Sequence, residues 1–241
     1  KGIHNQDRIR PVDEDLMALY QSDGLGVRIV TLAPETVPSG TIAALTKSGV
    51  RVCAGHTAGT YDDMQSALGE GLAGFTHLFN AMTPMESRAP GVVGAALDDD
   101  ATWCGLIVDG HHIHDATLRA AIKAKAPGKM ILITDAMPSV GSDMQAFDLY
   151  GRTITVEDDR CMAEDGTLAG SHLDMASAVR NTVAGVGLDL EEALRMASRY
   201  PAEFLGLGDQ RGRITPGYRA DFALLDDDLQ VTKTWIEGSD T

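Results

Sequence analysis

The chain has 241 residues, 44% of them hydrophobic and 23% charged, values typical of one large or two modest globular domains, which exclude a disordered, collagen-like or coiled-coil chain. The formal net charge of −15 argues against nucleic-acid and anionic-membrane partners, which need a cationic surface, and no apolar run is long enough to span a membrane. The only cysteines, Cys53, Cys104 and Cys161, are too few for a disulfide framework, so a cytoplasmic location is the simplest expectation.

The first half of the chain alternates between apolar runs and helical patterns. The runs of strand length cover residues 27–33, 50–55, 74–77, 102–108 and 129–134. Helical patterns at 39–48, 61–70 and 115–126 lie between them. The strand ends follow one another at intervals of roughly 20 to 30 residues, which is typical of parallel βα units.

Polar residues stand where four of these strands end. They are His56, His77, Asp109 and Asp135. In an open doubly wound sheet such residues would be spread along an edge, whereas in a barrel they converge on one mouth. We therefore predict an α/β fold of the (β/α)8 TIM-barrel type. A complete barrel takes about 250 residues, and only five clear strands, with a sixth near 167–169, are found here. We expect the N-terminal strands to be missing and the chain to be a piece of a longer protein.

The second half changes character. Residues 146–168 resemble a β-hairpin insertion, 174–186 and 190–200 are helical, and Pro201 is expected to end the second of these helices. From Gly212 onward the pattern alternates as in a short antiparallel sheet. The expected domains are a barrel at 1–207, incomplete at its N-terminus, and the C-terminal part of a small β domain at 208–241.

Two histidines at consecutive strand ends indicate a metal site. Neighbouring parallel strands lie about 4.8 Å apart, so His56 and His77 can share one ion. Asp135 ends the most apolar strand and has three interpretations: a helix cap, a metal ligand, or a general base beside the metal.

Further candidates lie in the segments that follow the strands. Three histidines occur within residues 111–114, and because neighbouring side chains point apart, we expect one of them to face the barrel mouth. Arg88 follows the third strand and suits a carboxylate or phosphate, or is an exposed surface charge. Gly170 and Ser171 either bind a ligand oxygen or form a turn.

Taken together, these motifs resemble the N-acetylglucosamine-6-phosphate deacetylase family of the amidohydrolase superfamily. The most specific part is Thr-His-Leu-Phe-Asn-Ala-Met at 76–82 followed by Arg-Ala-Pro-Gly at 88–91. Other matching motifs occupy residues 1–5, 31–35, 54–56, 109–112, 134–136 and 166–171, so the resemblance covers essentially the whole chain. It implies metal-dependent hydrolysis of the acetamide of N-acetyl-D-glucosamine 6-phosphate, giving D-glucosamine 6-phosphate and acetate.

The resemblance also implies roles for single residues. His56 and His77 would bind a divalent metal, with zinc expected ahead of iron or another ion, and a third ligand, a Glu, would precede Lys1. Asp135 would act as the general base and then protonate the departing amine. The implied substrate-binding residues are His4, Asn80, Ala81, Arg88, His112, Leu168 and Ser171. In this family, phosphate contacts can come from a neighbouring subunit, so the resemblance implies a homodimer. It also implies that the ligand is a small amino-sugar phosphate.

Two alternatives remain open from the sequence. The same fold could hydrolyse another cyclic or acyl amide. The chain could also be an inactive fragment or an interaction subunit, because it lacks the third metal ligand.

Overall fold

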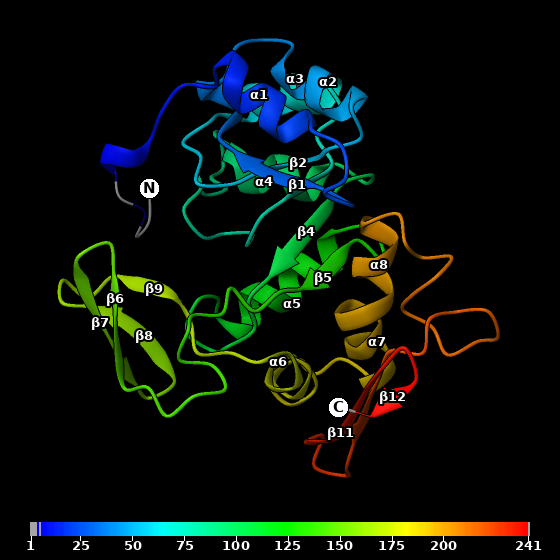
Figure 1. The fold of residues 1–241 in the computed structure, drawn as a ribbon. Coiled ribbons are helices and arrows are strands. Elements are labelled where there is room, and N and C mark those ends of the chain that lie inside the picture. The colour runs from blue at the N-terminus through cyan, green and yellow to red at the C-terminus, as the bar shows by residue number, and fades with distance from the viewer. Residues whose placement is uncertain (1–3, 5, 241) are drawn as a thin grey trace.

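The computed structural model describes residue 4 and residues 6–240, and its centre is a five-stranded parallel sheet (Figure 1). The strands lie in chain order and are β1 (Ile29–Leu32), β2 (Arg51–Ala54), β3 (Gly74–Phe75), β4 (Trp103–Leu106) and β5 (Met130–Leu132). All four pairings are parallel, with Leu32 opposite Ala54 and Leu106 opposite Leu132. The five strands predicted from the sequence are therefore confirmed in number, order and direction, although each is shorter than its apolar run.

Helical segments precede β1 and connect the successive strands of this sheet (Figure 1). They are η1 (Gln6–Arg8), α1 (Glu14–Gln21), η2 (Pro34–Thr36), α2 (Thr41–Lys47), α3 (Tyr61–Gly69), α4 (Gly91–Asp98) and α5 (Asp115–Ala124). The sequence patterns predicted α2, α3 and α5 but missed α1 and α4. Helix α4 has small and apolar residues on all sides, and Val92, Val93, Ala95 and Ala96 are buried in it, so it shows little amphipathic periodicity.

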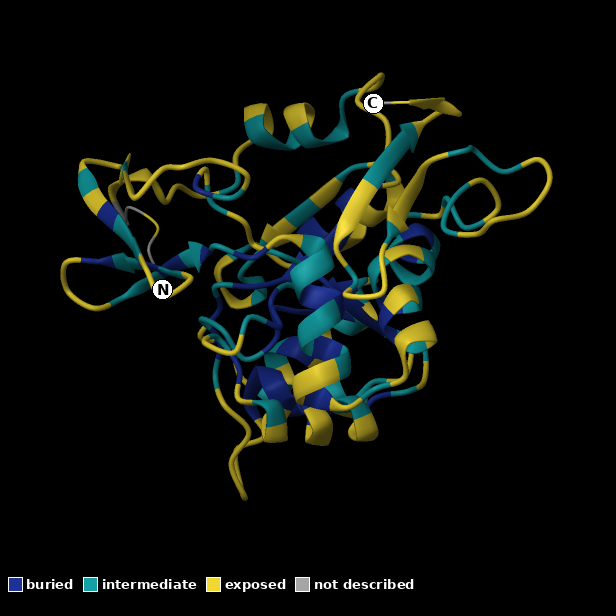
Figure 2. Cartoon of the chain, turned by 90° about the horizontal axis from the view of Figure 1, so that it is seen from below, coloured by how far each residue is buried: buried dark blue, intermediate teal, exposed yellow. Residues whose placement is uncertain are grey.

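The hydrophobic core lies between the sheet and its helices. Buried residues concentrate there, whereas the outward faces of the helices are exposed (Figure 2). Leu45 and Met64 from α2 and α3 and Leu106 from β4 are fully buried in this single cluster. Apolar strands packed against helices are typical of α/β architectures, and this packing fixes where the strands end.

A separate antiparallel sheet follows β5 and projects from one side of the molecule (Figure 1). It consists of β6 (Ala146–Leu149), β7 (Arg152–Glu157), β8 (Arg160–Ala163) and β9 (Leu168–Ser171). The region expected to be one hairpin at 146–168 thus forms four strands and extends to Ser171. The expected sixth barrel strand near 167–169 belongs mainly to this sheet, and only Ser171 pairs in parallel, with Ala136.

Each of the two C-terminal helical segments contains a stretch of π-helix. Helix α6 (Met175–Asn181) continues into the π-helix η3 (Thr182–Val186), and α7 (Leu190–Leu194) continues into the π-helix η4 (Arg195–Arg199) and then α8 (Tyr200–Phe204). Pro201 was expected to end the helix, which was wrong. It occupies the first turn of α8, where its missing N–H group is tolerated.

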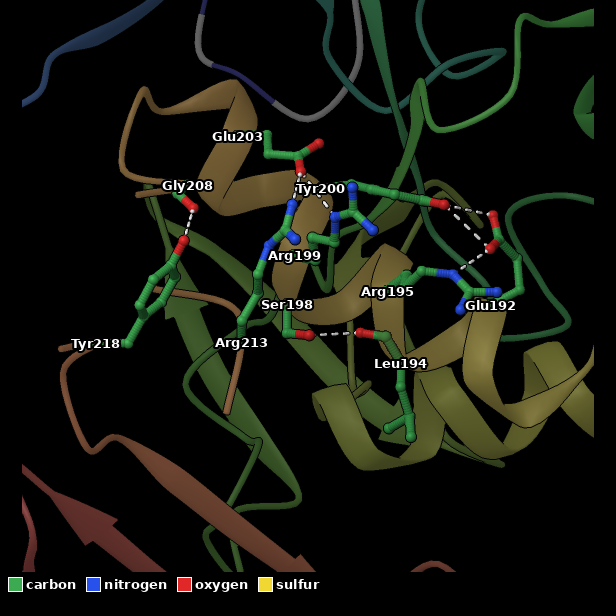
Figure 3. Close-up of polar contacts among 10 residues, drawn as sticks. All are labelled: Glu192, Leu194, Arg195, Ser198, Arg199, Tyr200, Glu203, Gly208, Arg213 and Tyr218. Atoms are coloured by element: carbon green, nitrogen blue, oxygen red, sulfur yellow. Dashed lines mark hydrogen bonds and ion pairs between the residues drawn. The ribbon is translucent and has the colours of Figure 1, made fainter. Parts of the chain in front are cut away.

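Ion pairs and hydrogen bonds hold this helical segment to the chain that follows it (Figure 3). Glu192 accepts hydrogen bonds from Arg195 at 2.7 Å and from the Tyr200 hydroxyl at 3.0 and 3.1 Å. Glu203 accepts from Arg199 at 2.7 Å and from Arg213 at 3.1 Å, which ties the loop after α8 to the helix.

The chain ends in a small antiparallel sheet of β10 (Phe222–Leu225), β11 (Val231–Ile236) and β12 (Ser239–Asp240). Within the part of the chain that the structure describes, no helix has both the length and the apolar character needed to cross a bilayer.

Candidate active site

The predicted metal and catalytic residues follow directly after strands of the parallel sheet. His56 lies two residues beyond β2, His77 two residues beyond β3, and Asp135 three residues beyond β5. All three have a left-handed backbone, with φ of 49°, 36° and 51°. This conformation costs a residue other than glycine about 1–2 kcal/mol and is concentrated at functional sites. The chain therefore turns sharply at each strand end and keeps these side chains at one edge of the sheet.

The two imidazoles meet edge to face. Their Nε2 atoms are 2.9 Å apart, and the ring planes are inclined by 83°. Two nitrogen ligands of one tetrahedral zinc ion, each at about 2.05 Å, would be roughly 3.3 Å apart. The rings need to separate by only a few tenths of an ångström to bind one ion, so His56 and His77 fit as two ligands. No group of three or more His, Cys, Asp or Glu side chains able to hold a metal occurs among the described residues, so a third protein ligand is not among them.

Glu35 supports the loop that carries His56. Its carboxylate accepts hydrogen bonds from the Thr57 hydroxyl at 2.5 Å and from the Ala58 backbone N–H at 2.7 Å. Thr57 is fully buried, and its N–H donates to the carbonyl of Ala81 at 3.0 Å. Glu35 lies within the motif at residues 31–35 but was not predicted as a site residue, although it lies just after β1, as the two histidines lie just after β2 and β3.

Asp135 is held through its backbone. Its carbonyl accepts a hydrogen bond from the Ser171 N–H at 2.9 Å, and the Ser171 hydroxyl donates to the carbonyl of Thr134 at 2.5 Å. Ser171 is only 1% exposed, so the structure places its side chain beneath the site. The Asp135 side chain is exposed and lines the cavity described next.

The predicted residues surround one cavity of about 370 Å³. Eight of them line it, namely His4, His56, His77, Asn80, Ala81, His112, Asp135 and Leu168. Gly170, which was expected either to bind a ligand oxygen or to form a turn, also lines the cavity, and the remaining lining residues, Met137, Leu149, Tyr150 and Thr167, were not assigned from the sequence. Most of these come from the antiparallel sheet, which therefore forms one wall of the cavity. The volume suits a small molecule such as a monosaccharide phosphate.

Of the motif at residues 1–5, only His4 is among the described residues. Its ring lies 4.4 Å from that of His56, centroid to centroid. Desolvation, followed by the charge of His56, lowers the pKa of His4, whereas Asp135 acts in the opposite direction. His4 thus interacts both with a predicted metal ligand, His56, and with the predicted general base, Asp135.

One histidine of the 111–114 segment faces the cavity, as expected. It is His112, and its Nδ1 lies 2.6 Å from the Asp109 carboxylate. Burial on its own would raise the pKa of Asp109. Hydrogen bonds from His112 and from backbone N–H groups outweigh burial, so the pKa is lower than usual. His114 instead accepts a hydrogen bond from the Ala116 N–H at the start of α5.

Arg88 does not reach this cavity. It is exposed and lines a second cavity of about 500 Å³, formed by residues of the 58–62 and 83–91 segments. In the part of the chain that the structure describes, its guanidinium has no ion pair or hydrogen bond, so its role in binding an anion stays a prediction.

Known proteins resemble this chain in sequence and in structure. The model of the amidohydrolase family matches residues 22–239. The N-acetylgalactosamine-6-phosphate deacetylase of Shewanella sp. (strain ANA-3) is 41% identical over 238 residues, which are 99% of this chain and 60% of that protein.

Two solved structures extend the comparison. The N-acetylglucosamine-6-phosphate deacetylase of Pasteurella multocida superimposes with a TM-score of 0.96 at 35% identity, over 100% of this chain and 63% of that one. The N-acetyl-D-glucosamine-6-phosphate deacetylase of Mycobacterium smegmatis, solved with N-acetyl-D-glucosamine-6-phosphate, matches with a TM-score of 0.82 at 36% identity, over 89% of this chain and 57% of that one. The chain thus spans about three fifths of the length of such relatives, and the parallel sheet is part of a TIM-type barrel, as predicted.

Proposed function

Because the chain belongs to the amidohydrolase family, we propose that it carries most of the active site of a metal-dependent deacetylase acting on an N-acetylated amino-sugar 6-phosphate, with N-acetyl-D-glucosamine 6-phosphate as the leading substrate. The products are D-glucosamine 6-phosphate and acetate. One observation carries the proposal: His56, His77 and Asp135, from three different strand ends, line the same cavity.

His56 and His77 are the residues that would hold the metal, with zinc favoured by two imidazole ligands and iron or another divalent ion as alternatives. A third ligand, a Glu, is expected before residue 1. When bound, the metal polarises the acetyl carbonyl and lowers the pKa of the attacking water.

Asp135 moves the protons. Its carboxylate accepts a proton from water as the water oxygen bonds to the acetyl carbon. It then delivers that proton to the amine nitrogen as the C–N bond breaks, so that one group serves as base and then as acid. The hydrogen bond from the Ser171 N–H to the carbonyl of Asp135 holds the backbone from which the carboxylate projects.

The remaining lining residues bind the sugar. Asn80, Ala81, His112 and Leu168 line the same cavity as the two metal-binding histidines, and His4 lies beside His56. Arg88 lines a different cavity of the same chain. We propose that it binds the phosphate in the site of a second copy of the chain, which makes the enzyme a homodimer.

The cysteines of the described chain are free thiols, in keeping with a cytoplasmic protein.

The 4-epimeric substrate is a specific second candidate. The relative from Shewanella is named for N-acetylgalactosamine 6-phosphate and is more similar in sequence than the glucosamine deacetylases described above. The metal-binding and acid–base groups would serve both epimers, because the acetamide is the same in each.

The test is acetate release by the intact protein with added zinc, comparing both phosphorylated epimers and unphosphorylated N-acetylglucosamine. We expect turnover of a phosphorylated sugar, a drop of about 10²–10⁴-fold in kcat for Asp135→Asn, and mainly a raised KM for Arg88→Ala. Absence of turnover on both phosphorylated sugars, or full activity of Asp135→Asn, would overturn the proposal. Equal rates on the unphosphorylated sugar would favour a different amide substrate.

A further inference from the structure

The carboxylate of Asp109 is almost completely enclosed by the turn that carries His112. Its Oδ1 accepts the backbone N–H groups of His111 and His112, each at 2.9 Å, and its Oδ2 lies 2.6 Å from Nδ1 of His112. The side chains of Asp109 and His112 are only 5% and 7% exposed. Three hydrogen bonds from one short turn therefore fix this carboxylate in a single orientation.

This contact determines which ring nitrogen of His112 carries a proton. An ionised carboxylate only accepts hydrogen bonds, so Nδ1 must be the donor. The other nitrogen, Nε2, makes no hydrogen bond with any residue that the structure describes, and His112 lines the candidate active-site cavity. Nε2 is thus the ring atom left for a ligand.

We propose that Asp109 is a positioning residue that fixes the tautomer and the orientation of His112, so that Nε2 is presented to an oxygen of the bound substrate. The identity of that substrate as an amino-sugar phosphate rests on the function proposed above, but the fixed ring does not. A ring already held in its binding orientation loses less conformational freedom when the ligand binds.

The substitution Asp109→Asn tests the assignment at one atom. The amide oxygen can still accept the two backbone N–H groups, whereas the NH₂ group faces the ring. The ring then accepts at Nδ1, and its proton moves to Nε2. The turn is retained while the tautomer is reversed.

The chain contains a matched control. Asp99 also accepts two successive backbone N–H groups through one oxygen, from Ala101 at 3.1 Å and from Thr102 at 2.7 Å. It bonds to no histidine and does not line the cavity. Asp99→Asn therefore shows how the loss of a carboxylate charge at such a turn affects stability and kinetics when no histidine tautomer changes.

The first measurement is ¹⁵N NMR of the ligand-free intact protein labelled at histidine, at mildly alkaline pH, with the His112 signals assigned through His112→Gln. We expect a proton on Nδ1 in the parent protein and on Nε2 in Asp109→Asn. The second is steady-state kinetics with the phosphorylated sugar. Asp109→Asn should raise KM by about tenfold or more and change kcat by less than about threefold, while Asp99→Asn leaves both unchanged.

A proton on Nε2 in the parent protein would overturn the assignment whether or not Asp109→Asn folds. A KM for Asp109→Asn equal to that for Asp99→Asn would also overturn it, since Asp109 would then only stabilise the turn. If the parent protein hydrolyses neither sugar phosphate, the proposed function fails, and the ring signals alone decide the role of Asp109.

Discussion

We expect Glu35 to stabilise the loop that carries His56, and the substitution Glu35→Ala measures how large this stabilisation is. The substitution removes the carboxylate that accepts one hydrogen bond from the Thr57 hydroxyl at 2.5 Å and one from the Ala58 N–H at 2.7 Å. Ala58 is exposed, so water can replace its lost partner. Thr57 is fully buried, and a buried donor left without a partner costs about 1–3 kcal/mol. We expect a loss of about 2 kcal/mol in the free energy of unfolding.

The same change should weaken metal binding. His56 is held at a φ of 49°, a conformation that costs about 1–2 kcal/mol, and a loosened loop relaxes away from it. Substitutions of residues that orient metal ligands lower metal affinity by about 10–100-fold. Urea denaturation and zinc competition against a chelator measure the two effects, with Glu164→Ala, in an exposed turn, as the control. If Glu35→Ala matches that control to within about 0.5 kcal/mol and binds zinc as tightly as the parent, the reasoning is refuted.

Three further changes test other parts of the structure. Lys125, the C-cap residue of α5, is 3% exposed and donates hydrogen bonds to carbonyl groups at the end of α4, so Lys125→Met should lower the free energy of unfolding by about 1–3 kcal/mol. Lys123→Met, at an exposed position within α5, should not lower it, and equal urea midpoints for the two variants would contradict this. The N–H of Gly40 lowers the pKa of Glu70, and this stabilisation is complete above the unfolded pKa and is lost as the pH falls through the folded value. The stability gap between the parent and Glu70→Gln should therefore be about 1 kcal/mol at neutral pH and close in acid, and a gap that persists in acid would argue against it. Tyr150→Ala removes a ring from the cavity wall and should raise KM several-fold without changing the melting temperature, whereas an unchanged KM would place the tyrosine outside the substrate site.

The parallel sheet could be predicted because its strands are apolar, β2 to β5 are largely buried, and four of the five apolar runs end at polar residues. His56, His77 and Asp135 were found for that reason, and the structure brings them to one cavity. The antiparallel sheet was underestimated, because strands of four to six residues joined by tight turns give too few alternations to separate four strands from two.

Other parts of the site leave no signal in a single sequence. Tyr150 reaches the cavity from the tip of the β6–β7 turn with a φ of 57°, and no periodicity predicts where such a tip will lie. The pairing of Asp109 with His112 depends on a turn that brings residues three apart into contact. Helix α4 was missed because a helix buried on all sides lacks the polar face that reveals a helix.

The left-handed backbone at His56, His77 and Asp135 limits how this site can change. Valine or isoleucine would be poorly tolerated at these positions whatever their chemistry, so the accessible replacements are glycine, asparagine and the residues already present. Glycine would relieve the torsional cost at each position but would remove the side chains on which the proposed metal binding and proton transfer depend. Substitutions chosen to relieve backbone strain at this edge of the sheet would therefore conflict with the proposed function.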